Sequence, residues 1–285
     1  MNIKMNIKFD CIPCSINNYL RLVKTGVIPE ALQVPILRRL LGLLSTIDYS
    51  QSPPIIGRKM QRLIREFLQN PDPYRQIKEN YNRMMLELYP DFEILVKESE
   101  NPTDTAMRLA IAGNVIDFGS KYQLDVMDTI NRAMGAKLAI DDSRQLRHDL
   151  NQANSLLYIG DNCGEIALDK LFLETIDLPE MYFVVRDSPV INDVTIHDAE
   201  MTGLTTIAKV ITTGDDAPGA VWESTSKEFK NIFTKADVII SKGQGNLEGL
   251  IDIPHNNIYF LLVTKCDLIA ERVGTRKGEF IVKKG

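Results

Sequence analysis

The sequence lacks the features that place a protein in a membrane or on a nucleic acid. None of its apolar runs approaches the about 18–20 residues needed to span a bilayer, and the first residues lack the apolar stretch of a signal peptide. Basic residues do not predominate, because the formal net charge is −5, and no block of like charge is present. The composition therefore predicts a cytoplasmic protein that binds neither nucleic acid nor membrane.

Cysteine and histidine are scarce, with four and three residues in a chain of 285. Four cysteines do not make a disulfide scaffold at this length. A structural zinc site needs about four nitrogen or sulfur ligands, so the Cys11–Cys14 pair would have to recruit Cys163 or Cys266. Pro13 suits the first turn of a helix, where thiols have a lowered pKa. We expect Cys11 and Cys14 to lie near the functional site as a redox-sensitive or soft-metal-binding accessory, with plain packing thiols as the alternative.

The first half of the chain has a helical rhythm. Leucine, isoleucine and methionine recur at helical spacing in residues 36–44 and 60–68. Prolines at 53–54 and at 71 and 73 interrupt the pattern, and strand-like runs are scarce. These residues predict an all-α N-terminal domain over residues 1–150.

The second half, residues 151–285, alternates short β-rich runs with helical patterns. The expected strands are 155–159, 181–185, 209–212, 237–240 and 258–263, with a short terminal strand at 280–282. The five longer strands begin about 20 to 28 residues apart, which leaves room for a crossover helix between parallel strands. Their apolar runs are typical of strands covered on both faces. The predicted fold class is α/β, with a Rossmann-like three-layer domain that has a mainly parallel sheet.

Polar residues follow the expected strands. They are Asp161 and Asn162 after the first, Asp193 after the second, Gly243 and Gly245 after the fourth, and Lys265 after the fifth. Because the carboxyl ends of parallel strands open on one edge of a sheet, these residues should meet there. Carboxylate and amide oxygens suit Mg²⁺ or Mn²⁺, glycines let backbone N–H groups approach a phosphate, and a lysine neutralises it. The combination predicts a phosphoryl-handling metal site.

Each of these loops also has a purely structural interpretation. A single aspartate after a strand is most often a helix N-cap, and Gly243 and Gly245 alone could form a simple turn. Asp215 and Asp216 precede Ala-Pro-Gly and are typical of a turn that caps the next helix. The functional interpretation depends on several polar loops coinciding at one edge.

Three ordered motifs carry a family resemblance. They are Gly160-Asp161-Asn162-Cys163-Gly164-Glu165, Asn192-Asp193-Val194-Thr195 and Lys242-Gly243-Gln244-Gly245-Asn246-Leu247-Glu248. Together they resemble the damage-control phosphatase family, long called domain of unknown function 89. Residues 112–119 are similar to a further signature of that family, and the N-terminal Cys-x-x-Cys to its prokaryotic branch. The resemblance spans nearly the whole chain and implies a helical domain joined to a Rossmann-like domain.

The resemblance also implies roles for individual residues. The family's metal ligands fall on Asp161, Asn162 and Asp193, and Lys265 matches a lysine that contacts the phosphate. Backbone N–H groups near Gly243 and Gly245, together with Asn246, are expected on the substrate side. The implied cofactor is a divalent ion (Mn, Co, Ni or Mg) that activates water for direct attack on a phosphate ester.

Asn114 and Asp117 lie three residues apart on a helical pattern and therefore share one face. We expect this face to close the pocket from the helical domain and to contact substrate. The alternative is a buried cap or an interhelical hydrogen bond.

The predicted function is a divalent-metal-dependent phosphatase for phosphate monoesters of small metabolites, either sugar phosphates or damaged phosphometabolites. One rival is an S-adenosylmethionine-dependent carboxyl methyltransferase, because Gly160 and Gly164 follow the first strand, roughly where such enzymes bind this cofactor. Against it, Asp161 and Asn162 would crowd that loop with polar groups. The other rival is a non-catalytic module that binds a phosphometabolite. The sequence does not predict the natural substrate, the preferred metal or the oligomeric state.

Overall fold

The computed structural model describes residues 5–114, 123–255 and 257–285 of the chain. At its centre is a sheet with the strand order β1-β7-β6-β5-β2-β3-β4. The strands are β1 (Leu138–Asp141), β2 (Ser155–Ile159), β3 (Glu180–Val185), β4 (Lys209–Thr212), β5 (Val238–Lys242), β6 (Ile258–Val263) and β7 (Phe280–Lys284). Neighbouring strands are parallel except β6 and β7. The predicted α/β class with a mainly parallel sheet is confirmed.

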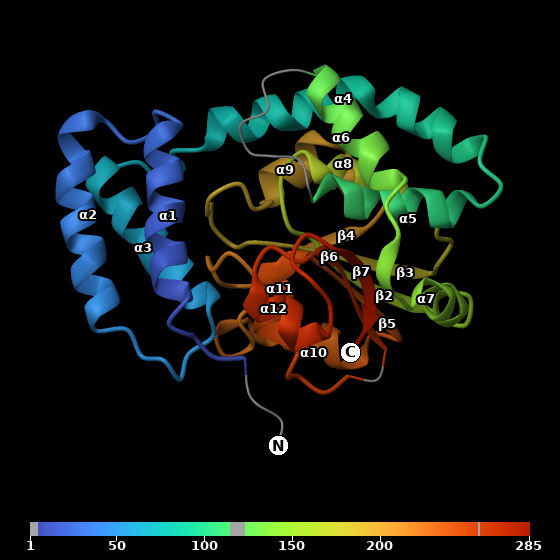
Figure 1. The fold of residues 1–285 in the computed structure, drawn as a ribbon. Coiled ribbons are helices and arrows are strands. Elements are labelled where there is room, and N and C mark those ends of the chain that lie inside the picture. The colour runs from blue at the N-terminus through green and yellow to red at the C-terminus, as the bar shows by residue number, and fades with distance from the viewer. Residues whose placement is uncertain (1–4, 115–122, 256) are drawn as a thin grey trace.

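Helices cover both faces of the sheet (Figure 1). One face carries α4 (Arg75–Lys97), α5 (Pro102–Gly113), α6 (Gln123–Met134), α7 (Ser143–Leu150), α8 (Glu165–Leu173) and α9 (Ile196–Met201). The other face carries α10 (Lys227–Lys235), α11 (Gly243–Leu250) and α12 (Asp267–Val273). Successive strand residues point to opposite faces: Leu156 and Tyr158 pack in the first core, and Leu157 and Ile159 in the second. The sheet is therefore the middle of three layers.

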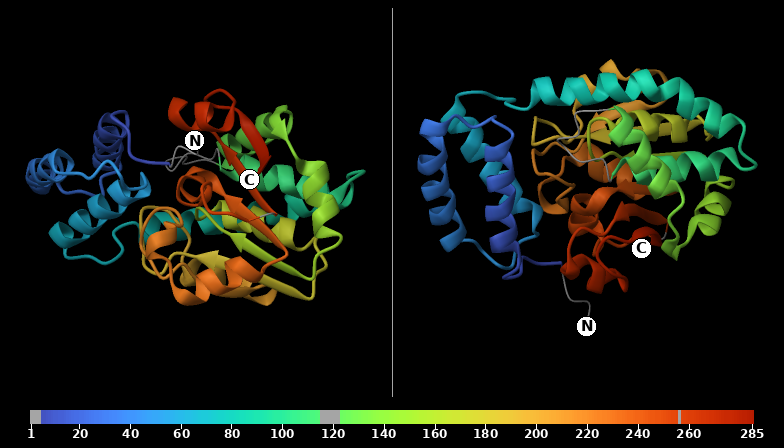
Figure 2. Two further views of the ribbon diagram at one scale, coloured as in Figure 1. Left: turned by 90° about the horizontal axis from the view of Figure 1, so that it is seen from below. Right: turned by 45° about the horizontal axis from the view of Figure 1, so that its top comes forward.

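Helices α1 (Cys11–Lys24), α2 (Glu30–Ser45) and α3 (Pro54–Leu68) form a separate helical unit beside these layers. Both views in Figure 2 keep this unit to one side of the sheet. It has its own core, in which Ile36, Leu40 and Ile64 are completely buried. Arginines of α3 attach it to the loop after β4, with Arg58 2.7 Å from Asp215 and Arg62 2.5 Å from Asp216.

The strand predictions were accurate, with one omission. Strands β2, β4 and β6 have the predicted bounds, and β3, β5 and β7 differ by one or two residues. Strand β1 lies in the stretch that was predicted to be all helical. It has four residues, of which only Leu138 is buried, so it carries no apolar run, and it pairs with β7 at the edge of the sheet. A domain boundary at residue 150 stays a prediction.

The chain reverses its direction of winding between β2 and β5. From β2 it proceeds outward through β3 to β4, and it then returns to β5 on the other side of β2. Loops from neighbouring strands part at such a point and leave a crevice at the carboxyl ends, where ligands bind in open α/β sheets. Within the described ranges, no helix combines the length and the apolar character that crossing a membrane requires.

Candidate functional site

The loops after β2 and β3 are joined at the reversal point. Asn162 and Asp193 form an isolated antiparallel bridge, Cys163 N donates to Asn192 O at 2.8 Å, and Val194 N donates to Asp161 O at 3.0 Å. The side chains of Asp161 and Asp193 are both buried here. The structure thus brings together the three residues that were predicted to bind metal.

Two amides hold the carboxylate of Asp161. The Nδ2 groups of Asn162 and Asn114 each donate to Asp161 Oδ2 at 2.8 Å. Asn114 follows the last turn of α5 and is buried, so the helical layer does reach the predicted site. Its Oδ1 atom is buried without a hydrogen-bond partner. Asp117, the other residue predicted on this face, lies outside the described residues.

Gly243 supports the same carboxylate from the end of β5. A Cβ atom at this position would lie 1.9 Å from Asp161 Oδ2, and the φ of Gly243 is +77°. Any side chain would therefore collide with Asp161, and the backbone conformation itself favours glycine. The predicted importance of Gly243 has a structural basis, although a contact with phosphate stays a prediction.

We expect Gly243→Ala to displace Asp161, to lower the free energy of unfolding by about 1–3 kcal/mol and to reduce any metal-dependent activity about 10- to 100-fold. Gly26→Ala is the matched control, because Gly26 has a φ of +78° but open space around it. Urea unfolding and an activity assay on both variants separate the collision from the backbone strain. Equal losses in the two variants would show that Asp161 does not depend on Gly243.

Arg186 forms a buried ion pair with Asp193. This guanidinium is completely buried: its Nε donates to Asp193 Oδ2 at 2.7 Å and its Nη2 to Asn246 Oδ1 at 3.0 Å. Asn246 also donates through Nδ2 to Gly160 O at 3.0 Å and to Lys242 O at 2.6 Å. The amide of Asn246 is thus used within the protein, and its predicted contact with a substrate stays a prediction.

A buried ionic network lies next to Asp161. Lys242 Nζ donates to Asp169 Oδ1 at 2.6 Å, to Ala110 O at 2.8 Å and to Glu165 Oε1 at 3.3 Å. Glu165 in turn accepts hydrogen bonds from both Asn114 and Asn162, at 3.1 and 3.3 Å. Glu165, Lys242 and Arg186 were not predicted as site residues, although the first two stand inside the quoted motifs. The sequence signal that could have identified these three residues is a charged side chain within a stretch that is otherwise apolar or rich in glycine.

The site contains more negative charge than its cations neutralise. Burial raises the pKa of Asp193 to about 7, an effect that Arg186 opposes and Asp161 reinforces. Burial likewise raises the pKa of Glu165 to about 7, against the influence of Lys242. The described residues contain no ready group of three His, Cys, Asp or Glu side chains that could hold a metal. The predicted ligand set is not a group of that kind, because it consists of two carboxylates and one amide.

Lys265 lies at the exposed mouth of the site. Its backbone N–H donates to Gln244 Oε1 at 2.7 Å, and the same amide donates through Nε2 to Glu248 at 2.8 Å and to Cys266 Sγ at 3.4 Å. The positive charge of Lys265 opposes the rise in the pKa of Glu165, although less than that of Lys242. Burial raises the pKa of Glu248 to about 7.

Cys11 and Cys14 start α1, and burial raises the pKa of both thiols. This differs from the expected lowering at a helix N-terminus, because the desolvation of the thiolates outweighs the helix dipole. The charges of Glu248 and Cys266 add to the rise in the pKa of Cys11. An accessory role for the two thiols stays a prediction.

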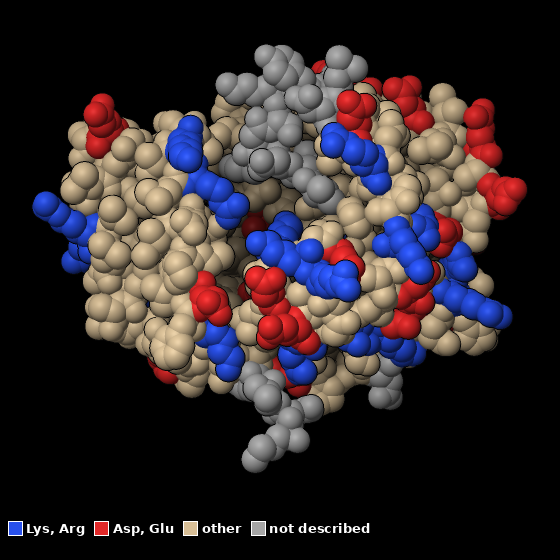
Figure 3. Space-filling model, viewed as in Figure 1, with Lys and Arg blue, Asp and Glu red and all other residues tan. Residues whose placement is uncertain are grey.

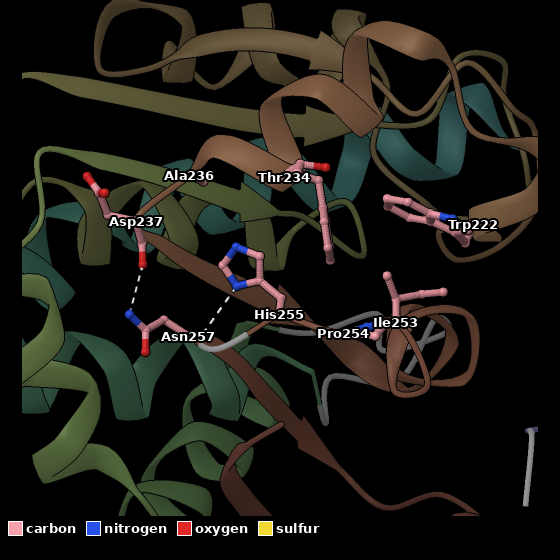
Figure 4. Close-up of a pocket in the computed structure, with 9 residues that line it drawn as sticks. Trp222, Thr234, Ala236, Asp237, Ile253, Pro254, His255 and Asn257 are labelled. Carbon is pink, nitrogen blue, oxygen red and sulfur yellow. Dashed lines mark hydrogen bonds between the residues drawn. The ribbon is translucent and has the colours of Figure 1, made fainter. Parts of the chain in front are cut away.

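A larger hollow of about 600 Å³ lies at the amino ends of β5 and β6, away from the carboxyl ends that carry the predicted site (Figure 4). It is lined by Trp222, Phe233, Thr234, Ala236, Asp237, Ile253, Pro254, His255 and Asn257. None of the residues that were predicted from the sequence lies in it. Around Asn162, by contrast, a cavity of about 10 Å³ is lined by Glu165, Gly113 and Asn192, among others, which is about the room needed for a single water-sized group.

Comparison with known proteins gives consistent matches along the chain. The model of the damage-control phosphatase ARMT1-like domain matches residues 7–281. The damage-control phosphatase PH1575 of Pyrococcus horikoshii is 33% identical over 286 residues, which cover 97% of each chain. An uncharacterized protein of Methanocaldococcus jannaschii, MJ0202, is 35% identical and covers 98% of this chain and 96% of its own.

A solved structure agrees with the fold. The crystal structure of PH1575, described as a DUF89 family protein, superimposes with a TM-score of 0.90 at 32% identity, and the match covers 98% of this chain and 99% of that one. The match includes the helical unit α1–α3 as well as the three layers. The chain therefore belongs to the damage-control phosphatase ARMT1-like family, the family of domain of unknown function 89.

Proposed function

We propose that this protein is a divalent-metal-dependent phosphatase that hydrolyses phosphate monoesters of small metabolites. The observation that carries the proposal is the pair of buried carboxylates, Asp161 and Asp193, held together at the reversal point of the sheet with an excess of negative charge around them. Two relatives bear the name damage-control phosphatase, which supports the same chemistry.

The residues present fit a divalent cation. Asp161, Asn162 and Asp193 would hold it, since carboxylate and amide oxygens are the ligands that Mg²⁺ and Mn²⁺ prefer. Burial raises the pKa values of Asp193 and Glu165 because it disfavours their charged forms, and a bound cation would favour those forms. When bound, such an ion would polarise a phosphate ester and lower the pKa of a water molecule.

The protein's own residues supply the rest of the chemistry. Asn114 orients Asp161 through its hydrogen bond, and Arg186 fixes Asp193 in the same way. Helix α11 begins at Gly243, at the end of β5, and the free N–H groups of its first turn suit phosphate oxygens. Lys265 would add a positive charge at the mouth, where the equatorial oxygens of the phosphate become more negative in the transition state.

Thermal unfolding with different ligands tests the metal and separates the phosphatase from a methyltransferase. A cation that binds only the folded state at about 100 times its Kd adds about 2.7 kcal/mol to the free energy of unfolding. We expect 1 mM Mn²⁺ to raise the Tm by roughly 5–10 °C on this basis, and S-adenosylmethionine to leave it unchanged. A shift with S-adenosylmethionine and none with Mn²⁺, Co²⁺, Ni²⁺ or Mg²⁺ would reverse the assignment.

Phosphate release from a panel of sugar phosphates and phosphorylated cofactor precursors, measured with each of these metals, tests catalysis itself. Turnover that disappears with a chelator and returns with metal is the expected result. Tight binding of phosphate esters without any turnover would instead indicate a binding module.

A further inference from the structure

The helical unit meets the rest of the chain along a border that is partly open. Figure 3 shows a hollow there, with basic and acidic side chains on its rim. Helix α3 makes a close contact with the loop after β4: Arg58 pairs with Asp215 at 2.7 Å, and a Cβ atom at Gly57 would lie 2.6 Å from Pro218 Cγ. The same helix also reaches the loop after β3, which carries a proposed metal ligand.

The Asp193 loop, residues 187–193, follows β3 and carries this ligand. Its first residue is tied to the loop after β4, because Asp187 N donates to Asp215 O at 3.2 Å. Its last part is tied to the loop after β2, because Cys163 N donates to Asn192 O at 2.8 Å. The part between these two ties needs a restraint of its own.

Ile191 lies in this middle part, with its backbone in a conformation that isoleucine rarely adopts. Its φ is +44°, in the left-handed region that a β-branched side chain makes unfavourable. Such a residue keeps this conformation only where the surrounding structure holds it there. Because Ile191 precedes Asp193 by two residues, relaxation of its backbone would move the carboxylate of Asp193.

A side chain of the helical unit contacts the loop close to this strained residue. Arg65, in the last turn of α3, donates through Nη1 to Pro189 O at 2.5 Å and through Nη2 to Asp216 Oδ2. Its side chain is only 16% exposed. A guanidinium is planar and presents its donors in a fixed fork. One rigid group therefore binds both the loop after β4 and the carbonyl two residues before Ile191.

Arg62 stands one turn earlier on α3 and binds the same carboxylate. It donates through Nε to both oxygens of Asp216 at 3.0 Å and through Nη2 to Oδ1 at 2.5 Å. Within the part of the chain that the structure describes, it has no hydrogen bond to the Asp193 loop. Asp216 therefore keeps a cationic partner when Arg65 is removed, whereas Pro189 O loses a donor.

We propose that Arg65 is a positioning residue of the metal site: by binding Pro189 O, it holds the strained Asp193 loop in the conformation that the site requires. The proposal rests on the metal-dependent phosphatase function proposed above and adds a residue of the helical unit to its site. In this role Arg65 acts through the loop rather than on metal or substrate. The alternative is that the burial of Val190 and the bridge between Asn162 and Asp193 hold the loop without Arg65.

The affinity of the full chain for Mn²⁺ alone, measured by isothermal titration calorimetry, tests the proposal without an assay of turnover. We expect Arg65→Met to raise the Kd for Mn²⁺ about tenfold, at the lower end of the effects that residues behind metal ligands have on affinity. Arg62→Met is the matched control, because it also removes one arginine from Asp216. Its Kd should stay within about twofold of that of the wild type. The Tm of each variant in a chelator shows whether it is folded.

Ile191→Gly tests whether Arg65 acts by holding the strained backbone. Glycine adopts a positive φ readily, so the loop no longer needs to be held in this conformation from outside. The loss of affinity caused by Arg65→Met should therefore shrink from about tenfold to about twofold in the Ile191→Gly background. A purely structural role of Arg65 in docking the helical unit would leave that loss unchanged, because docking does not depend on the φ of Ile191.

Arg65→Lys takes the place of Arg65→Met if the latter does not fold, with Arg62→Lys as its control. Lysine keeps a positive charge beside Asp216 but lacks the fork, so the Kd for Mn²⁺ should rise about threefold in Arg65→Lys and stay unchanged in the control.

The outcomes separate this proposal from the one on which it rests. A wild-type Kd in the Arg65 variant, an equal loss in the Arg62 control, or a loss that persists in the Ile191→Gly background would overturn the role of Arg65 and leave the metal site intact. Absence of binding of Mn²⁺, Co²⁺, Ni²⁺ and Mg²⁺ to the wild type would overturn the metal site and the role of Arg65 together.

Discussion

Replacing Asp161 with alanine is expected to reduce metal-dependent phosphatase activity by more than about 100-fold while the protein remains folded. Asp161 provides one of only two carboxylates in the proposed ligand set, so its loss removes half of the ligand charge. Stability should not suffer, because Asn114 and Asn162 keep Glu165 as a hydrogen-bond acceptor. Removal of one carboxylate also relieves repulsion at Glu165 and Asp193. Activity with saturating Mn²⁺ and the Tm in a chelator are the two measurements.

Asp187→Ala is the matched control, because Asp187 is exposed in the same loop as Asp193 and its carboxylate accepts a hydrogen bond from Thr212 Oγ1 at 3.0 Å. It should keep nearly full activity. Asp193→Ala should also be inactive but less stable, since it leaves the buried Arg186 without its closest partner, a loss of about 3–5 kcal/mol for a broken buried pair. Near-normal turnover in Asp161→Ala would show that the site is elsewhere.

The convergence of the predicted site residues could be foreseen because it follows from topology. Once Leu156–Ile159 and its counterparts are taken as parallel strands, the residues after them must meet at one edge. Asp161, Asn162 and Asp193 do meet there, and the apolar runs gave the strand bounds because each is buried on both faces. Strand β1 escaped prediction for the opposite reason: a four-residue edge strand with one buried side chain has no pattern to detect.

The buried network next to Asp161 could not be predicted from the sequence. A lysine at the end of a strand and a glutamate at the start of a helix are ordinarily exposed. Here Lys242 and Glu165 turn inward because the end of α5 closes over them: Ala110 supplies a carbonyl to Lys242, and Asn114 an amide to Glu165. That contact joins segments that are distant in the chain, and no local pattern records it.

Lys242→Met is expected to have the largest effect on stability, because this ammonium is completely buried and is the close cationic partner of both Asp169 and Glu165. Its removal leaves two like charges in an apolar setting, which should lower the free energy of unfolding by about 3–5 kcal/mol at pH 8. Methionine nearly preserves the volume of the side chain, so a cavity contributes little. Lys235→Met, at an exposed position in α10, should stay within about 0.5 kcal/mol of the wild type.

The pH dependence of this loss distinguishes charge from packing. Burial raises the pKa of both Glu165 and Asp169 in the folded protein, and removal of the lysine raises both pKa values further. A folded state whose carboxyls have raised pKa values binds more protons than the unfolded chain, so stability increases as the pH falls, by about 1.4 kcal/mol per pH unit for each extra proton. Urea unfolding of the two proteins in a chelator should therefore show a much smaller difference at pH 5.5 than at pH 8. A difference that is constant between these pH values would mean that Lys242 stabilises the fold through packing and its bond to Ala110, and that Asp169 and Glu165 are not held in place by its charge.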